Sequence, residues 1–147
     1  MWPPVFRDER KAALNPTSMR QIGCALASTG AVLGFHPEGT RGKGPDPYEL
    51  LPPKAGVGQI LRVCHPDTVV LPFFILGMSS DIKQELVYMV RPPADGSGDI
   101  RIHFDAPMTA GELSAGRDAQ EIADHLHSVL VGLGEQDRAV YGALEPK

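Results

Sequence analysis

The sequence predicts a single α/β domain in which a mostly parallel mixed sheet is flanked by helices. The chain has 147 residues, of which 42% are hydrophobic and 22% charged, as is typical of one globular domain. Helix-like and strand-like patterns alternate along it, which favours an α/β arrangement. We find no internal repeat, low-complexity tract or domain boundary, so residues 1–147 are expected to form one domain.

Composition and charge exclude several classes of protein. The formal net charge of −4 argues against a general nucleic-acid-binding protein. Cys24 and Cys64 form no CxxC pair, so a reducing compartment is expected and a zinc site is not. Residues 1–10 lack the pattern of a signal peptide, and the longest apolar run, Val69 to Leu76, is far shorter than the roughly 20 residues that span a bilayer. These features predict a cytoplasmic protein that does not cross a membrane by itself.

The first part of the chain alternates strand, helix and strand patterns. Residues 5–7 resemble the end of a strand. Asn15 can cap a helix that has Pro16 at its first position and ends before Gly30. The apolar run from Ala31 to Phe35 then predicts a short buried strand, which extends to residue 36.

The middle of the chain predicts a loop, a short helix and a strand. Prolines and glycines exclude regular structure over most of residues 42–53. Apolar residues at helical spacing predict a short helix within residues 54–64. Residues 68–76 are nearly free of polar side chains, which is typical of a strand covered on both faces.

The last part of the chain predicts a hairpin and a long helix. Residues 85–90 and 100–104 are the expected strands, joined by a turn at residues 95–99. The final helix has apolar residues at steps of three and four from Ala119 to Leu133, with glycines near its end. We expect this amphipathic helix to pack on the sheet.

The most informative stretch reads Phe-His-Pro-Glu-Gly-Thr-Arg, at residues 35–41. Gly39 allows the backbone to approach a ligand closely, and Thr40 offers a hydroxyl group. Arg41 presents a planar set of donors that suits a phosphate, with Lys43 as a second positive charge nearby. These residue types are compatible with an oxyanion-binding turn, although a turn of this composition is more often a solvated surface turn.

The order of these residues closely resembles the Phe-Pro-Glu-Gly-Thr-Arg block of the glycerolipid acyltransferases, the family of 1-acylglycerol-3-phosphate O-acyltransferases. Further blocks match in order. Val5-Phe6-Arg7 stands where the family has a strand ending in an arginine, and residues 54–58 followed by 69–73 match its downstream helix and strand. The resemblance covers essentially the whole chain and implies a glycerol-3-phosphate acyltransferase-like fold.

The resemblance also implies an activity. An acyl group would pass from acyl-CoA or acyl carrier protein to the hydroxyl of a lysophosphatidate-like acceptor, in phospholipid biosynthesis, by an enzyme peripherally associated with the membrane. Arg41, helped by Arg7, would bind the acceptor phosphate. Glu38 would bind the glycerol hydroxyls or fix Arg41, while Gly39 and Thr40 complete the substrate-binding turn. No metal or cofactor, and no nucleic-acid partner, is implied.

One part of the family pattern is absent. The family's catalytic unit is a histidine followed five positions later by an aspartate, and none of the five histidines here has an aspartate at that spacing. His36 lies beside the turn, but no carboxylate stands at the spacing that would orient it. We therefore assign no catalytic residue and expect the chain to be the C-terminal part of an acyltransferase domain, incomplete at its N-terminus.

Two other interpretations stay open. The chain would be a non-catalytic phospholipid-binding or phosphate-binding module if it binds the acceptor without turnover. It would be a relic of an acyltransferase if its core is exposed, in which case it should aggregate or form oligomers.

Overall fold

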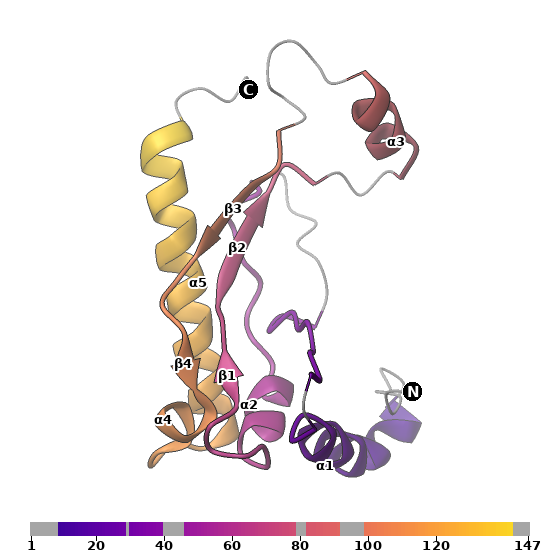
Figure 1. Ribbon diagram of the computed structural model, residues 1–147, viewed down its shortest axis with the longest axis vertical. Helices are drawn as coiled ribbons and strands as arrows, with labels where there is room; N and C mark the ends of the chain where they lie inside the picture. The colour runs from indigo at the N-terminus through magenta and orange to yellow at the C-terminus, as the bar shows by residue number, and fades with distance from the viewer. Residues whose placement is uncertain (1–8, 29, 40–45, 79–81, 92–98, 143–147) are drawn as a thin grey trace.

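The computed structural model describes residues 9–28, 30–39, 46–78, 82–91 and 99–142 (Figure 1). Its secondary structure is mainly helical, with short strands. The elements in chain order are η1 (Glu9–Leu14), α1 (Asn15–Ala25), α2 (Gly56–Leu61), β1 (Val69–Val70), β2 (Phe73–Leu76), α3 (Ile82–Val90), β3 (Arg101–Phe104), β4 (Met108–Thr109), α4 (Ala110–Ser114) and α5 (Ala119–Tyr141).

The molecule is elongated, and α5 runs along most of its length beside a long ribbon of strands (Figure 1). Helices α1, α2 and α4 gather at one end of this ribbon. Helix α3 lies at the other end, apart from the remaining helices (Figure 1). No helix in the described parts of the chain is long and apolar enough to cross a membrane.

The predicted mostly parallel mixed sheet with flanking helices is wrong, and so is the glycerol-3-phosphate acyltransferase-like fold that includes it. The described strands form two antiparallel pairs, β1 with β4 and β2 with β3, which follow one another along the ribbon. Pro72 separates β1 from β2 because proline has no backbone N–H to donate. Its carbonyl still accepts a hydrogen bond of 3.0 Å from the N–H of Asp105, which keeps the two halves of the ribbon aligned.

Among the described elements, helices cover one face of the ribbon. Side chains alternate along β2, so that Phe74 is buried against α5 while Phe73, on the other face, is 46% exposed. Phe104 pairs with Phe73 and is 61% exposed. The expectation of a strand covered on both faces is therefore wrong, because no described element lies over the second face as helices lie over both faces of a parallel sheet.

Two predicted strands do not form. Residues 31–36 are irregular, and Val32 is 83% exposed instead of buried. Residues 85–90 belong to α3, since Lys83 to Leu86 are good helix formers and no described strand pairs with them. The predicted hairpin is therefore wrong. The strand expected at 100–104 is present as β3, but its partner is β2.

The predicted helices are confirmed, with changes at their ends. Helix α1 includes Asn15 as its first residue, so the capping position falls on Leu14, which forms no side-chain cap. Helix α2 lies within the predicted segment. Helix α5 begins after a capping box formed by Asp118 and Glu121, and it continues past the predicted end to Tyr141. Residues 46–53 are irregular, as predicted.

Two glycines let the helices at one end of the molecule approach each other closely. A Cβ atom on Gly58 would lie 1.9 Å from the carbonyl oxygen of Ala119, so the backbones of α2 and α5 are in direct contact. A Cβ atom on Gly23 would lie 2.5 Å from Cγ2 of Val63. Around these contacts, two clusters of buried apolar residues join α1, α2, α4 and α5.

Candidate functional site

The turn at Glu38 and Gly39 is held firmly to a later segment of the chain. Gly39 has a φ of +72° and donates its N–H to the carbonyl of His36 at 2.8 Å. The Glu38 side chain is buried, and its Oε2 atom accepts a hydrogen bond of 3.0 Å from the N–H of Leu51. The N–H of Lys54 donates to the carbonyl of Pro37 at 2.9 Å. The described part of the turn is therefore held in place by hydrogen bonds to residues 51 and 54.

A lysine side chain lies against the open side of this turn. If Gly39 carried a Cβ atom, that atom would lie 3.3 Å from Cδ and 3.8 Å from Nζ of Lys54. Within the described parts of the chain, no carboxylate forms an ion pair with Lys54. From its sequence alone, Lys54 is only the first residue of a predicted helical segment. The structure places its side chain beside Gly39.

The structure brings together part of the predicted site. Glu38 and Gly39 are adjacent in the turn, but Glu38 binds a backbone N–H and not the side chain of another site residue. The predicted residues Arg7, Thr40 and Arg41 lie outside the described residues, as do the strand expected at residues 5–7 and most of the turn expected at 95–99. Glu38 was expected to bind the glycerol hydroxyls or Arg41, and its observed contact with Leu51 gives it a role in shaping the turn.

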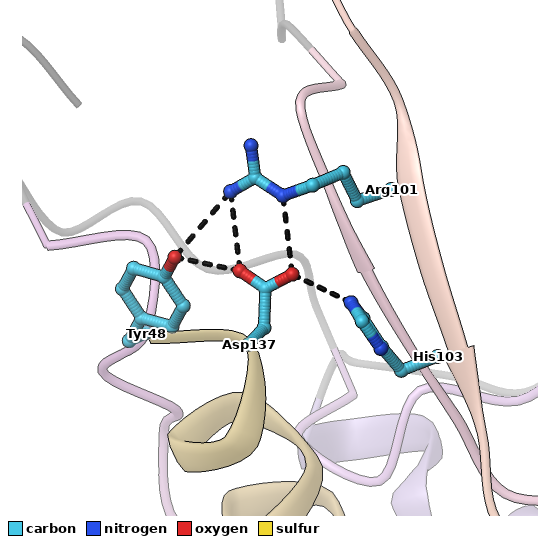
Figure 2. A network of polar contacts seen from close by, with 4 residues as sticks. All are labelled: Tyr48, Arg101, His103 and Asp137. Atoms are coloured by element: carbon cyan, nitrogen blue, oxygen red, sulfur yellow. Dashed lines mark hydrogen bonds and ion pairs between the residues drawn. The ribbon is translucent and has the colours of Figure 1, made fainter. Parts of the chain in front are cut away.

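A second polar cluster surrounds Asp137, which is fully buried on α5 (Figure 2). The guanidinium group of Arg101 donates to both of its oxygens, each at 3.1 Å. The hydroxyl of Tyr48 donates to Oδ1 at 2.7 Å, and Nε2 of His103 lies 2.6 Å from Oδ2. Three donor side chains therefore share one carboxylate.

Strand register explains how the cluster assembles. Arg101 and His103 are two positions apart on β3, so both point to the face that α5 covers. Their cross-strand partners, Leu76 and Phe74, are buried on the same face. On α5, Asp137 continues the buried stripe one turn after Leu133.

The electrostatic balance at Asp137 favours its charged form. Burial by itself would raise the pKa of this carboxyl group. The hydrogen bonds from Arg101, Tyr48 and His103, together with the charge of Arg101, outweigh burial and hold the pKa below its ordinary value. Because the carboxylate is occupied by these donors, we interpret the cluster as an anchor that joins β3 and the segment around Tyr48 to α5.

Further contacts attach the same segment to α5. Asp46 forms an ion pair with Arg138, and this hydrogen bond is the main reason that the pKa of Asp46 lies below its ordinary value. The guanidinium of Arg138 lies 4.6 Å from the ring centre of Tyr48, and that ring stacks on Phe74 at 6.1 Å. The described residues on both sides of 40–45 are thus anchored, one side through Glu38 and the other through Asp46 and Tyr48.

The Asp137 cluster was not predicted, although two patterns in the sequence point to it. A carboxylate falls on the apolar stripe of the last helix, and two cationic or titratable residues alternate with apolar ones in the strand at 100–104. The family pattern pairs a histidine with an aspartate five positions later. His103 and Asp137 are 34 positions apart, so that pattern does not identify them as partners.

No described group of three or more histidine, cysteine, aspartate or glutamate side chains is arranged to hold a metal ion. Cys24 and Cys64 are free thiols on α1 and just after α2. Burial raises the pKa of Cys64, and the nearby Cys24 raises it further. The Cys64 thiol is therefore a poor nucleophile at neutral pH.

Comparison with known proteins adds no family assignment: no family model, no curated protein and no solved structure matches this chain.

Proposed function

We propose that the turn at residues 36–41 binds the phosphate of a lysophosphatidate-like acceptor. In this proposal the chain supplies the acceptor-binding part of an acyltransferase, which moves an acyl group from acyl-CoA or acyl carrier protein to the acceptor hydroxyl. The proposal depends on the resemblance of residues 35–41 to the Glu-Gly-Thr-Arg block of the glycerolipid acyltransferases.

The observation that carries the proposal is the ammonium group of Lys54 beside Gly39. Gly39 has a positive φ, and its missing side chain leaves the backbone accessible at the residue before Thr40 and Arg41. Lys54 adds a cation with no described acidic partner at this position. A solvated surface turn needs neither a buried glutamate to fix it nor an unpaired cation beside it, whereas an anion site benefits from both.

Binding of a short-chain lysophosphatidate, below its micelle-forming concentration, tests the proposal. A charge-assisted hydrogen bond contributes roughly 1.5–3 kcal/mol, so Arg41→Gln and Lys54→Gln should each weaken binding about 10 to 100-fold. Arg91→Gln removes the same charge from the exposed residue that follows α3 and should leave affinity unchanged. Equal affinities for all four proteins would overturn the proposal.

A measurement of acyl-transfer turnover distinguishes an enzyme from a non-catalytic binding module. Acyl transfer requires removal of the acceptor's hydroxyl proton as its oxygen attacks the thioester carbonyl and the thiol leaves. General-base catalysis contributes about 10² to 10⁴-fold, and no residue of this chain is assigned to it. Lysophosphatidate binding that depends on Arg41, without turnover even when a segment carrying His-x4-Asp is supplied, would favour the non-catalytic phospholipid-binding module.

Peripheral contact with a membrane surface is part of the same proposal, and α3 supports it. Leu86 and Val87 are 58% exposed, and Met89 and Val90 are 81% exposed, on a helix that lies apart from the others (Figure 1). The double variant with Met89→Glu and Val90→Glu should bind less to phosphatidylcholine–phosphatidylglycerol vesicles. Val32→Glu, at a similarly exposed site elsewhere, is the matched control.

A further inference from the structure

An apolar stripe runs along the face of the ribbon that no described helix covers. Side chains alternate between the two faces over residues 69–76, and the alternation continues across the break at Pro72. Val70 and Phe74 face the helices and pack in the core. The outward positions are all apolar: Val69, Leu71, Phe73 and Ile75 on one side of the ribbon, and Ile102 and Phe104 on β3.

Most of this stripe is open to solvent. The exposed fractions are 67% for Val69, 48% for Leu71, 46% for Phe73, 46% for Ile102 and 61% for Phe104. An antiparallel sheet with one face in water normally places polar side chains on that face. The stripe has none, so its pattern is typical of a surface that another surface covers.

The size of the stripe fits a dimer interface. At these exposed fractions, two aromatic rings and three aliphatic side chains leave roughly 400 Å² of apolar surface open. A stable interface of standard size buries about 800 Å² on each partner, and about 56–65% of that area is apolar, which gives roughly 450–520 Å² per partner. The stripe supplies most of this apolar area.

The chemistry of the stripe favours an apolar protein surface as its partner. Arg101 and His103 of β3 point to the opposite face of the ribbon, where both contact Asp137. Elements that bind a membrane surface carry lysine and arginine beside their apolar residues, and the stripe itself contains neither. A second copy of the stripe matches it in size and in chemistry, and leaves no charge of either stripe buried without a partner.

We propose that the stripe is the interface of a symmetric homodimer, in which the ribbons of two copies pack face to face. A two-fold axis places the same patch on both sides of the contact, so one apolar stripe meets the other. Phe73 and Phe104 already pack on each other, with ring centroids 5.9 Å apart and ring planes tilted by 42°. Facing sheets lie about 10 Å apart, a spacing at which such side chains interdigitate. The interface does not depend on the acceptor-binding role proposed above.

Sedimentation equilibrium of the full chain, over a range of protein concentrations, tests the proposal. The wild type should form a discrete species of twice the 15.8 kDa mass of one chain. Phe73→Lys and Phe104→Lys should each weaken dimerisation at least about 100-fold, because a symmetric interface receives each buried charge twice. Val140→Lys, at a 64% exposed position on α5, should change dimerisation less than about 2-fold.

Backbone amide shifts, compared between concentrated and dilute protein, give a second measurement that needs no variant. The largest changes should fall at residues 69–75 and 102–104. Largest changes in α3 would assign the dimer to the apolar side chains of that helix and would overturn the proposal. A chain that stays monomeric at every concentration, an open series of larger species, or a dimer that neither phenylalanine variant weakens would also overturn it.

The membrane contact proposed for α3 can be tested apart from this interface. The double variant with Met89→Glu and Val90→Glu should dimerise like the wild type, since both residues lie on α3 and not on the stripe. Loss of dimerisation in this variant would place the interface on α3 and contradict the proposal.

Discussion

The Nε2 atom of His103 lies 2.6 Å from the Oδ2 atom of Asp137, across 34 positions of sequence. The same carboxylate holds Arg101 and Tyr48, so one side chain of α5 fixes a strand and a loop (Figure 2). Through Tyr48 this anchor also secures the segment that follows residues 40–45. The stability of the fold and the placement of the candidate turn are therefore linked.

Removing the carboxylate should destabilise the protein strongly. Asp137→Ala leaves Arg101 and His103 without their buried partner, and breaking a buried ion pair in this way costs about 3–5 kcal/mol. We expect a loss of stability at the lower end of this range, because the side chains of Arg101 and His103 are partly exposed to water. Urea denaturation measures the loss. Glu135→Gln, on the exposed side of the same helix, is the control, and equal midpoints for the two variants would contradict the anchoring role.

The same group predicts a dependence on pH. The folded-state pKa of Asp137 lies below its unfolded value of about 3.9. The charged carboxylate therefore contributes stability above that unfolded value, and the contribution disappears as the pH falls through the folded pKa. Unfolding midpoints measured from pH 6 downward should fall less steeply for Asp137→Asn than for the wild type. If the unfolding midpoints of both proteins fall equally steeply with pH, Asp137 does not govern the loss of stability in acid.

Two glycine substitutions should have opposite effects. Gly58→Ala would place a Cβ atom 1.9 Å from the carbonyl oxygen of Ala119, which forces α2 and α5 apart and should cost about 1–3 kcal/mol or more. Gly132→Ala lies inside α5 with no atom within 4 Å of its new Cβ, so it should stabilise the helix by about 0.5–1 kcal/mol. Thermal melts of both variants check the signs.

The candidate turn should depend on the backbone of Gly39. A residue with a side chain pays roughly 1–2 kcal/mol in the left-handed region, and here the new Cβ would also press against Lys54. Gly39→Ala should therefore lower both stability and lysophosphatidate affinity. Gly34→Ala is the matched control, because it has no positive φ and open space around its Cβ position. Wild-type behaviour of both variants would argue that the turn is not a binding site.

Glu38 tests whether the turn is shaped by its buried carboxylate. Glu38→Ala removes the acceptor for the N–H of Leu51 and leaves that donor unpaired, at a cost of about 1–3 kcal/mol. Glu38→Gln keeps a side-chain oxygen at the same distance from the backbone and should recover most of the loss. If the two variants are equally unstable, the charge of Glu38 matters more than its hydrogen bond. Chemical denaturation of both variants separates these cases.

Local patterns predicted α1, α2 and α5, but not α3, which was expected to be a strand. Ile122, Leu126 and Leu133 repeat at the period of α5, and each helical hydrogen bond joins residues only four apart. Strand patterns were less informative, because a strand forms only when it pairs with another segment, and its own sequence does not specify that segment. Residues 31–36 have the apolar character of a strand but form no hydrogen-bonded pair with a described strand. Residues 85–90 are mostly apolar as well, but they form part of a helix.

The sequence by itself determined where α1, α2 and α5 lie, and it predicts an oxyanion-binding turn at residues 35–41, which stays a prediction. Tertiary structure decided that β2 pairs with β3, that α5 covers only one face of the ribbon, and that Lys54 lies beside Gly39. It also decided that Asp137 could be buried, since its charge is balanced by donors from Tyr48 and β3. The difference is physical: helical hydrogen bonds close within one turn of chain, whereas strand pairing and charge burial depend on residues that only the folded chain brings together.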